Sequence, residues 1–207
     1  MAGINISEVF YSIQGETSLV GKPCIFIRLA GCNLRCSWCD TEYAQSGGRQ
    51  REVEQLIQEV KKFNCRVAVI TGGEPLIQAG VYELMNRLIK EKFMVVLETN
   101  GSRDISRVPD KVKIILDIKT PSSGESDKMN LSNVEKLKKD GELKFVISDR
   151  NDFIWSKKIL SQTDFKGEVL ISPVKDKISI ETLCGWVKKE LPDSRVQFNP
   201  HHVYKIR

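Results

Sequence analysis

The segment from Cys24 to Asp40 reads CIFIRLAGCNLRCSWCD, and the rest of the chain can be interpreted from it. Its first six residues are mostly apolar and predict a buried strand, which runs directly into a loop that carries Cys32, Cys36 and Cys39. The cysteine spacing is Cys-x3-Cys-x2-Cys. A [4Fe–4S] cluster has four irons, each normally held by one cysteine thiolate. Three closely spaced thiolates can therefore hold three corners of such a cluster and leave the fourth iron open to a small-molecule ligand.

Zinc is the alternative metal for this loop, because its last two cysteines have the spacing of a zinc knuckle. A structural zinc site is nearly always closed by four ligands. The two histidines, His201 and His202, lie in the C-terminal tail, and the chain has no second Cys-x2-Cys. Cys24 and Cys65 could complete a site but fall within predicted strands or at their edges. A non-catalytic, zinc-bearing interaction module therefore remains an alternative.

Beyond the loop, strand-like and helix-like segments alternate along the chain. After the strand at 24–29, further apolar runs predict strands at 66–71, 93–97, 113–117, 143–147, 169–171 and 196–198. Apolar residues at helical spacing predict intervening helices, one of them at 132–139 with a capping box formed by Ser132 and Glu135. Such alternation implies a parallel sheet. Since a full eight-stranded barrel typically needs ~250 residues, the sequence predicts an α/β fold with an open, partial parallel βα barrel of about six core strands, in a single domain over residues 1–207.

The composition is that of an ordinary globular protein, with 41% hydrophobic and 29% charged residues. No stretch approaches the roughly 20 apolar residues needed to cross a bilayer, and the first eight residues lack the pattern of a secretory signal. The formal charge of +5 is spread over scattered pairs such as Lys61-Lys62, which is typical of solvated helix faces. We therefore expect a cytoplasmic protein that binds neither nucleic acid nor membranes.

With Trp38 between its last two cysteines and Asp40 after them, the cysteine loop resembles the signature loop of radical S-adenosylmethionine (SAM) enzymes. The run Thr71-Gly72-Gly73-Glu74-Pro75, one βα unit later, resembles the loop that meets the methionine amino group of SAM in those enzymes. The resemblance implies that Cys32, Cys36 and Cys39 hold a [4Fe–4S] cluster, at which SAM is cleaved to a 5′-deoxyadenosyl radical. It also implies an outside reductant such as flavodoxin or ferredoxin, because SAM cleavage requires a low cluster potential.

The first part of the chain indicates which radical SAM family the sequence resembles. The segments Glu8–Thr17, Gly21–Pro23 and Phe26–Leu29, with Asp40-Thr41 after the cysteine loop, closely resemble 7-carboxy-7-deazaguanine synthases, which act in queuosine biosynthesis. The resemblance covers nearly the whole chain. It implies a homodimeric carbon–nitrogen lyase that converts 6-carboxy-5,6,7,8-tetrahydropterin to 7-carboxy-7-deazaguanine with loss of ammonia, regenerating SAM and assisted by Mg²⁺.

The same resemblance implies a set of site residues. For the substrate these are Ile13, Gln14, Gly15, Glu16, Arg28 and Thr71. For SAM they are Trp38, Cys39, Asp40, Gly73, Glu98, Lys119, Thr120 and Pro121, with Ser172 and Pro173 as weaker candidates, and Thr41 is the expected Mg²⁺ ligand. The planar guanidinium of Arg28 suits bidentate binding of the substrate carboxylate. An ion pair inside the barrel is its alternative role.

A second radical SAM interpretation remains open. Glycyl-radical-enzyme activating enzymes are similarly small and share the Cys-x3-Cys-x2-Cys spacing, but they abstract hydrogen from a protein glycine and consume SAM. The early run Gln14-Gly15-Glu16-Thr17 and Arg28 favour the pterin enzyme.

Overall fold

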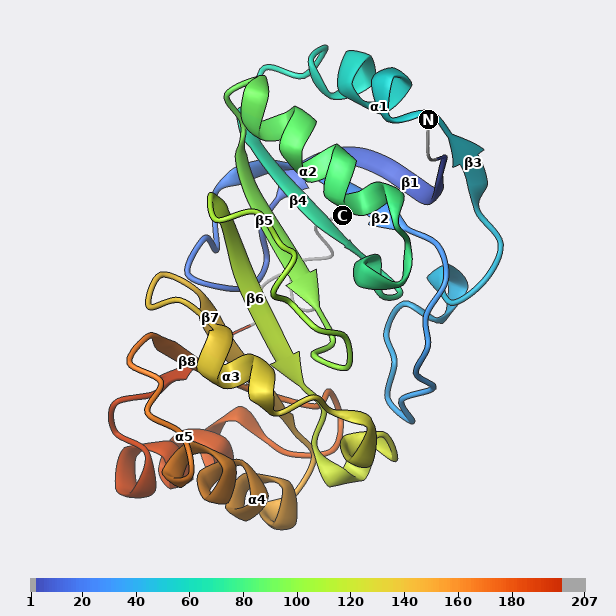
Figure 1. Cartoon of the computed structure of the whole chain (residues 1–207). Helices are drawn as coiled ribbons and strands as arrows, with labels where there is room; N and C mark the ends of the chain where they lie inside the picture. The colour runs from blue at the N-terminus through green and yellow to red at the C-terminus, as the bar shows by residue number, and fades with distance from the viewer. Residues whose placement is uncertain (1–2, 199–207) are drawn as a thin grey trace.

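A computed structural model describes residues 3–198 of the chain (Figure 1). Within these residues the backbone forms one nine-stranded sheet in the order β3-β1-β2-β4-β5-β6-β7-β8-β9. The strands are β1 (Ile4–Ile13), β2 (Pro23–Leu29), β3 (Arg49–Arg51), β4 (Val67–Gly72), β5 (Met94–Thr99), β6 (Val112–Ile118), β7 (Glu142–Ile147), β8 (Glu168–Pro173) and β9 (Arg195–Val196). The α-helices are α1 (Val53–Val60), α2 (Gly80–Lys90), α3 (Ser132–Lys136), α4 (Arg150–Ser161) and α5 (Ile180–Glu190).

The parallel part of the sheet confirms the predicted fold. All seven predicted strands are present, and they pair in parallel from β2 through β4, β5, β6, β7 and β8 to β9. Because β9 has two residues, six longer strands carry the parallel core. The sheet does not close, since β3 and β9 lie at its two ends.

Two strands, β1 and β3, are not predicted by the sequence pattern. β1 pairs antiparallel with β2, and β3 pairs antiparallel with β1 at the end of the sheet. Their apolar signal is weak for a physical reason: most of β1 is half-buried, and β3 consists of the polar residues Arg-Gln-Arg. Because β1 pairs with β2, the end of β1 and the residues after it, 13–16, lie beside the parallel strands.

Side chains of the parallel strands alternate between two faces of the sheet. On one face they pack against the helices and form the larger core, which includes Ile27 and Ile70 of the sheet with Leu84 and Phe153 of the helices. On the other face a smaller apolar cluster joins four strands to the β1–β2 loop: Leu19, Cys24, Phe26, Val69, Val96 and Ile115. Since apolar residues cover both faces, the strands read as nearly continuous apolar runs.

The predicted helix at 132–139 is corrected by the structure. α3 ends at Lys136, and Ser132 is its first helical residue, whose hydroxyl donates to Asn130 Oδ1 at 2.8 Å. The predicted capping box of Ser132 and Glu135 is therefore wrong, because Leu131 occupies the N-cap position. In residues 3–198, no helix has the length and apolar character that a membrane span requires.

Candidate active site

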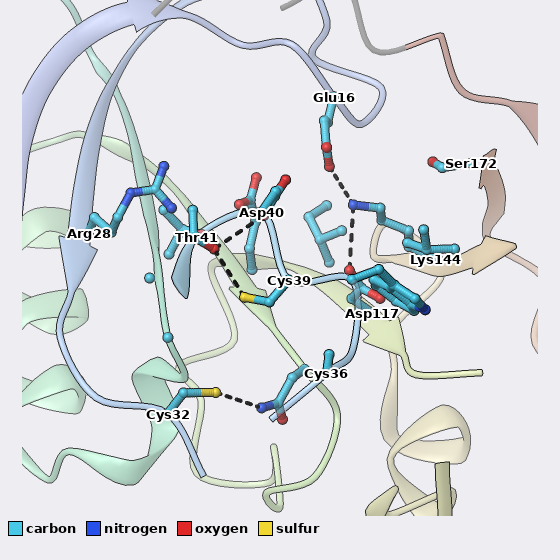
Figure 2. Close-up of a pocket in the computed structure, with 18 of the residues that line it drawn as sticks. Glu16, Arg28, Cys32, Cys36, Cys39, Asp40, Thr41, Asp117, Lys144 and Ser172 are labelled. Atoms are coloured by element: carbon cyan, nitrogen blue, oxygen red, sulfur yellow. Dashed lines mark hydrogen bonds and ion pairs between the residues drawn. The ribbon is translucent and has the colours of Figure 1, made fainter. Parts of the chain in front are cut away.

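A cavity of about 1040 Å³ opens at the C-terminal ends of the parallel strands. The next-to-last residue of each strand from β2 to β8 in the parallel part lines it: Arg28, Thr71, Glu98, Asp117, Val146 and Ser172. Phe26 and Ile115 of the smaller apolar cluster also line it, so part of this cluster contributes apolar surface to the cavity. Figure 2 shows Arg28, Asp117 and Ser172 directed into the same space as the cysteine loop.

All three cysteines of the loop line this cavity, and none forms a disulfide. Burial raises the pKa of the Cys36 thiol to about 11 and also raises the pKa of Cys32. The thiols of Cys32 and Cys36 are therefore protonated at neutral pH, and metal binding would remove their protons. Within residues 3–198, no three His, Cys, Asp or Glu side chains converge on a single-ion site. Three thiols that line one cavity suit a cluster, in which each thiolate binds its own iron.

A polar scaffold holds the second half of the cysteine loop. The Trp38 indole N–H donates to Ser122 Oγ at 3.1 Å, and the Ser37 hydroxyl donates to the Ser122 carbonyl at 2.7 Å. Ser122 is itself held by Asp152, a buried residue of α4, which accepts from the Ser122 N–H at 2.9 Å and from its hydroxyl. Lys119 lies over the Trp38 ring, with its Nζ 5.3 Å from the ring centre. The position of Trp38 thus depends on residues about 85 and 115 positions away in the chain.

The Gly-Gly-Glu-Pro run joins the end of β4 to the start of the cysteine loop. A Cβ on Gly72, whose φ is +137°, would lie 2.2 Å from the Leu29 carbonyl oxygen, and a Cβ on Gly73 would lie 2.0 Å from that of Gly31. Glu74 is fully buried and accepts hydrogen bonds from the backbone N–H groups of Leu76 and Asn100 and from the Thr99 hydroxyl, at 2.7–2.9 Å. The close approach that requires both glycines is therefore between two backbone segments.

Arg28 forms the ion pair that was expected as its alternative role, and it also lines the cavity. Its Nε donates to Glu8 Oε1 of β1 at 3.0 Å, and the Tyr43 hydroxyl donates to the same oxygen at 2.7 Å. Its guanidinium carbon lies 5.9 Å from the ring centres of Phe10 and Tyr43. The ion pair inside the barrel therefore exists, and it orients a guanidinium that still lines the cavity.

Opposite Arg28, the β1–β2 loop brings further polar groups into the cavity. The Gln14 amide donates to Glu98 Oε1 at 3.1 Å, and Gln14 Oε1 accepts from the Glu16 N–H at 3.1 Å. Burial and the negative charge of Glu16 raise the pKa of Glu98, while Lys144 and hydrogen bonds from Thr71 and Gln14 oppose that rise. This side of the cavity offers hydrogen-bond acceptors to a ligand rich in N–H groups.

An ion network crosses the cavity wall between β6 and β7. Asp117 Oδ2 lies 3.1 Å from Lys119 Nζ and 3.5 Å from Lys144 Nζ, and Lys144 also pairs with Glu16 (Figure 2). Burial alone would raise the pKa of Asp117, but the two lysine charges outweigh burial and lower it. Within residues 3–198, Asp117 Oδ1 and Ser172 Oγ are buried without a hydrogen-bond partner. Both atoms belong to cavity-lining residues, and an unpaired buried polar atom is costly unless a ligand satisfies it.

The structure brings together most of the site residues expected from the sequence. Those that line the cavity are Ile13, Gln14, Gly15, Glu16, Arg28, Cys32, Cys36, Trp38, Cys39, Asp40, Thr41, Thr71, Gly73, Glu98, Lys119, Ser172 and Pro173. Thr120 and Pro121 do not line it. Thr120 is buried and donates to the Val146 carbonyl at 2.8 Å, and Pro121 begins the short 3₁₀ helix that contains Ser122.

Two cavity residues, Asp117 and Lys144, were missed as site residues. Asp117 was read as the end of a strand, and Lys144 as an interior residue of the strand at 143–147. A signal was present, because a charged residue seldom sits in a buried strand without a partner. The same argument had singled out Arg28.

Comparisons with known proteins agree with this geometry. Residues 26–123 match the model of the radical SAM superfamily. The 7-carboxy-7-deazaguanine synthase of Koribacter versatilis is 37% identical, over 96% of this chain and 95% of that one. The enzyme of the same name from Methanospirillum hungatei is 41% identical, over 97% and 85%. The crystal structure of QueE from Escherichia coli shares the fold with a TM-score of 0.79 at 24% identity, over 94% and 92% of the two chains. The chain therefore belongs to the 7-carboxy-7-deazaguanine synthase family of the radical SAM superfamily.

Proposed function

We propose that this protein is a radical SAM carbon–nitrogen lyase that converts 6-carboxy-5,6,7,8-tetrahydropterin to 7-carboxy-7-deazaguanine with release of ammonia. Family membership implies a [4Fe–4S] cluster and SAM. The observation that carries the proposal is the convergence of three free cysteines, an oriented arginine and a set of carboxyl and amide acceptors on one cavity. A pterin carboxylate and the N–H groups of a pterin ring match these two kinds of partner.

The cysteine loop and the ends of β6 and β8 are the parts that fit the two cofactors. Cys32, Cys36 and Cys39 would hold the cluster, since all three line the cavity. The unpaired atoms Asp117 Oδ1 and Ser172 Oγ would bind polar groups of SAM. When bound, the cluster and SAM supply the radical chemistry that begins the ring contraction. The protein contributes position, through the hydrogen bonds by which Ser122 holds Trp38 and Ser37 of the cysteine loop.

The substrate would lie between Arg28 and the β1–β2 loop. Arg28 would bind the substrate carboxylate, because Glu8 already engages its Nε and thereby orients the guanidinium fork. Gln14, Glu16 and Glu98 would accept hydrogen bonds from the ring N–H groups. Arg28 would bind the carboxylate at one end of the substrate, and the acceptors would bind the N–H groups at its other end. Together these contacts would orient the pterin ring relative to the cofactors.

Mg²⁺ is the third group in the proposal. The Thr41 hydroxyl donates to Asp40 Oδ1 at 3.2 Å and lies 3.9 Å from Cys39 Sγ, so oxygen ligands stand beside the cysteine loop. Mg²⁺ prefers oxygen ligands and usually keeps several waters while bound to one or two carboxylates or to substrate. Thr41, the substrate carboxylate and waters would form such a set. We include in the same proposal a flavodoxin or ferredoxin as reductant, a homodimer, a cytoplasmic location and a single domain over residues 1–207.

An anaerobic assay tests the proposed function. The protein is reconstituted with iron and sulfide and supplied with 6-carboxytetrahydropterin, SAM, Mg²⁺ and a reductant. We expect ammonia and the deazaguanine product, with SAM largely conserved. Absence of product from protein that carries about four irons per chain would refute the reaction. SAM consumption only with a glycyl-radical protein would support the activating-enzyme alternative, and stoichiometric zinc in place of iron would support the interaction module.

A further inference from the structure

Lys144 connects the two halves of the cavity. It projects from β7 beside Asp117 of β6, its partner in the strand register, and pairs with Glu16 of the β1–β2 loop. Figure 2 shows its amino group between these two carboxylates. The side chain is buried, with 8% of the residue exposed, and its pKa is raised because the charges of Glu16, Asp117 and Glu98 outweigh the effect of burial. Lys144 is therefore a permanent cation among three carboxyl groups.

The β1–β2 loop depends on this cation where it enters the cavity. The middle of the loop is held elsewhere, since the Ser18 N–H and hydroxyl donate to Glu142 and the Thr17 N–H donates to Gln197 Oε1 at 3.0 Å. Glu16, by contrast, faces the like-charged Glu98, whose pKa its charge raises. Without a cation between them, two carboxylates in one cavity repel each other. Because Gln14 Oε1 accepts from the Glu16 N–H, movement of Glu16 would also displace Gln14.

We propose that Lys144 is a positioning residue for substrate binding: it holds Glu16, and through Glu16 the Gln14 amide, in the orientation that receives the pterin ring. This inference rests on the proposed function. It assigns Lys144 no contact with substrate and no part in proton transfer. The ion pair with Asp117 fixes the lysine on the sheet, so that Lys144 offers Glu16 a cation at a fixed position.

The test is a double-mutant cycle read out as substrate binding. Dissociation constants for 6-carboxytetrahydropterin are measured anaerobically by calorimetry for the wild type, Lys144→Met, Glu16→Gln and the double variant. We expect Lys144→Met alone to raise the dissociation constant ~10- to 100-fold, because the loop loses its orientation. In the Glu16→Gln background the same substitution should change it less than about 3-fold, since Lys144 then has no Glu16 charge to hold. Lys144→Arg should restore binding to within about 3-fold of wild type.

The controls separate this proposal from the proposed function and from a loss of folding. Lys157→Met removes a lysine that pairs with Glu190 between α4 and α5, and should leave substrate binding unchanged. Wild-type protein that does not bind the pterin would refute the proposed function. If the wild type binds the pterin and the two substitutions have additive effects on the binding free energy, the role of Lys144 is refuted and the proposed function is not. Where Lys144→Met does not fold, a change of ~10-fold or more between Glu16→Gln and the double variant would still refute the role of Lys144, because Glu16 then carries no charge for the lysine to hold.

Discussion

Replacement of Gly73 with alanine should displace the cysteine loop. A methyl carbon at this position would lie 2.0 Å from the Gly31 carbonyl oxygen, 2.5 Å from its carbon and 2.9 Å from Cys32 Cβ. Close carbon–oxygen contacts in proteins stay near ~3.3 Å, so the two segments must separate by more than an ångström. They cannot separate freely, since the Gly73 N–H donates to the Leu29 carbonyl at 3.1 Å and the Glu74 N–H donates to the Gly31 carbonyl at 2.8 Å.

The expected cost follows from these contacts. Overpacking against rigid backbone costs about 1–3 kcal/mol, and loss of the Glu74–Gly31 hydrogen bond adds about 1 kcal/mol. We therefore expect the free energy of unfolding to fall by ~2–4 kcal/mol. A functional constellation must be held to about 0.5 Å, so the shift at Cys32 should also reduce the iron retained after reconstitution.

Two measurements check this prediction: denaturant unfolding of the metal-free protein, and iron per chain after anaerobic reconstitution. Gly185→Ala is the matched control, because Gly185 lies in α5 with no atom within 4 Å of the added Cβ. That substitution should stabilise the protein by about 0.5–1 kcal/mol through helix propensity. Unchanged stability and iron content in Gly73→Ala would refute the packing argument. Unchanged stability with loss of SAM binding alone would assign this glycine to the ligand instead.

Three further predictions concern the cavity. Cys36→Ala should lose most of its iron, because two thiolates remain for the cluster, whereas Cys184→Ala in α5 should retain it; equal iron content in the two variants would contradict the ligand assignment. Thr41→Ala should raise the Mg²⁺ concentration for half-maximal activity ~10-fold and Thr41→Ser should not, and a Mg²⁺ titration that gives one curve for both variants would exclude this hydroxyl as a ligand. Burial raises the pKa of Glu98 above its ordinary 4.5, so the folded state holds this proton to higher pH than the unfolded state does. The free energy of unfolding should then fall as pH rises from 4.5 through the raised pKa, and Glu98→Gln should remove that fall. The prediction is checked by denaturant unfolding at several pH values, and it is wrong if the free energy of unfolding depends on pH equally in both proteins.

The parallel strands and the cysteine loop could be predicted because each has a strong local signal. Apolar runs marked all seven parallel strands, and the cysteine spacing marked the cluster loop. The weaker elements lacked such signals. β1 is half-buried along most of its length, and the Ser-x-x-Glu pattern at Ser132 suggested a cap that tertiary structure does not form. The sequence pattern linked the glycines of the Gly-Gly-Glu-Pro run to a ligand. It could not show their contact with Leu29 and Gly31, because that contact exists only after β2 and β4 pair.

The charged lining of the cavity shows why a charged residue in a predicted strand did not reveal its partners or its place in the site. Side chains on a strand alternate between faces, so a residue enters the cavity only if the strand extends far enough and if its side chain lies on the cavity face. The predicted strand at 93–97 stops one residue short of Glu98, although β5 continues to Thr99. The register between strands adds a second unknown: Glu98 lies opposite Ile115, so Asp117 stands one pleat higher and pairs with Lys144. The ion network of Glu16, Asp117 and Lys144 is therefore a product of the stagger of the partial barrel, and no single segment of the sequence contains it.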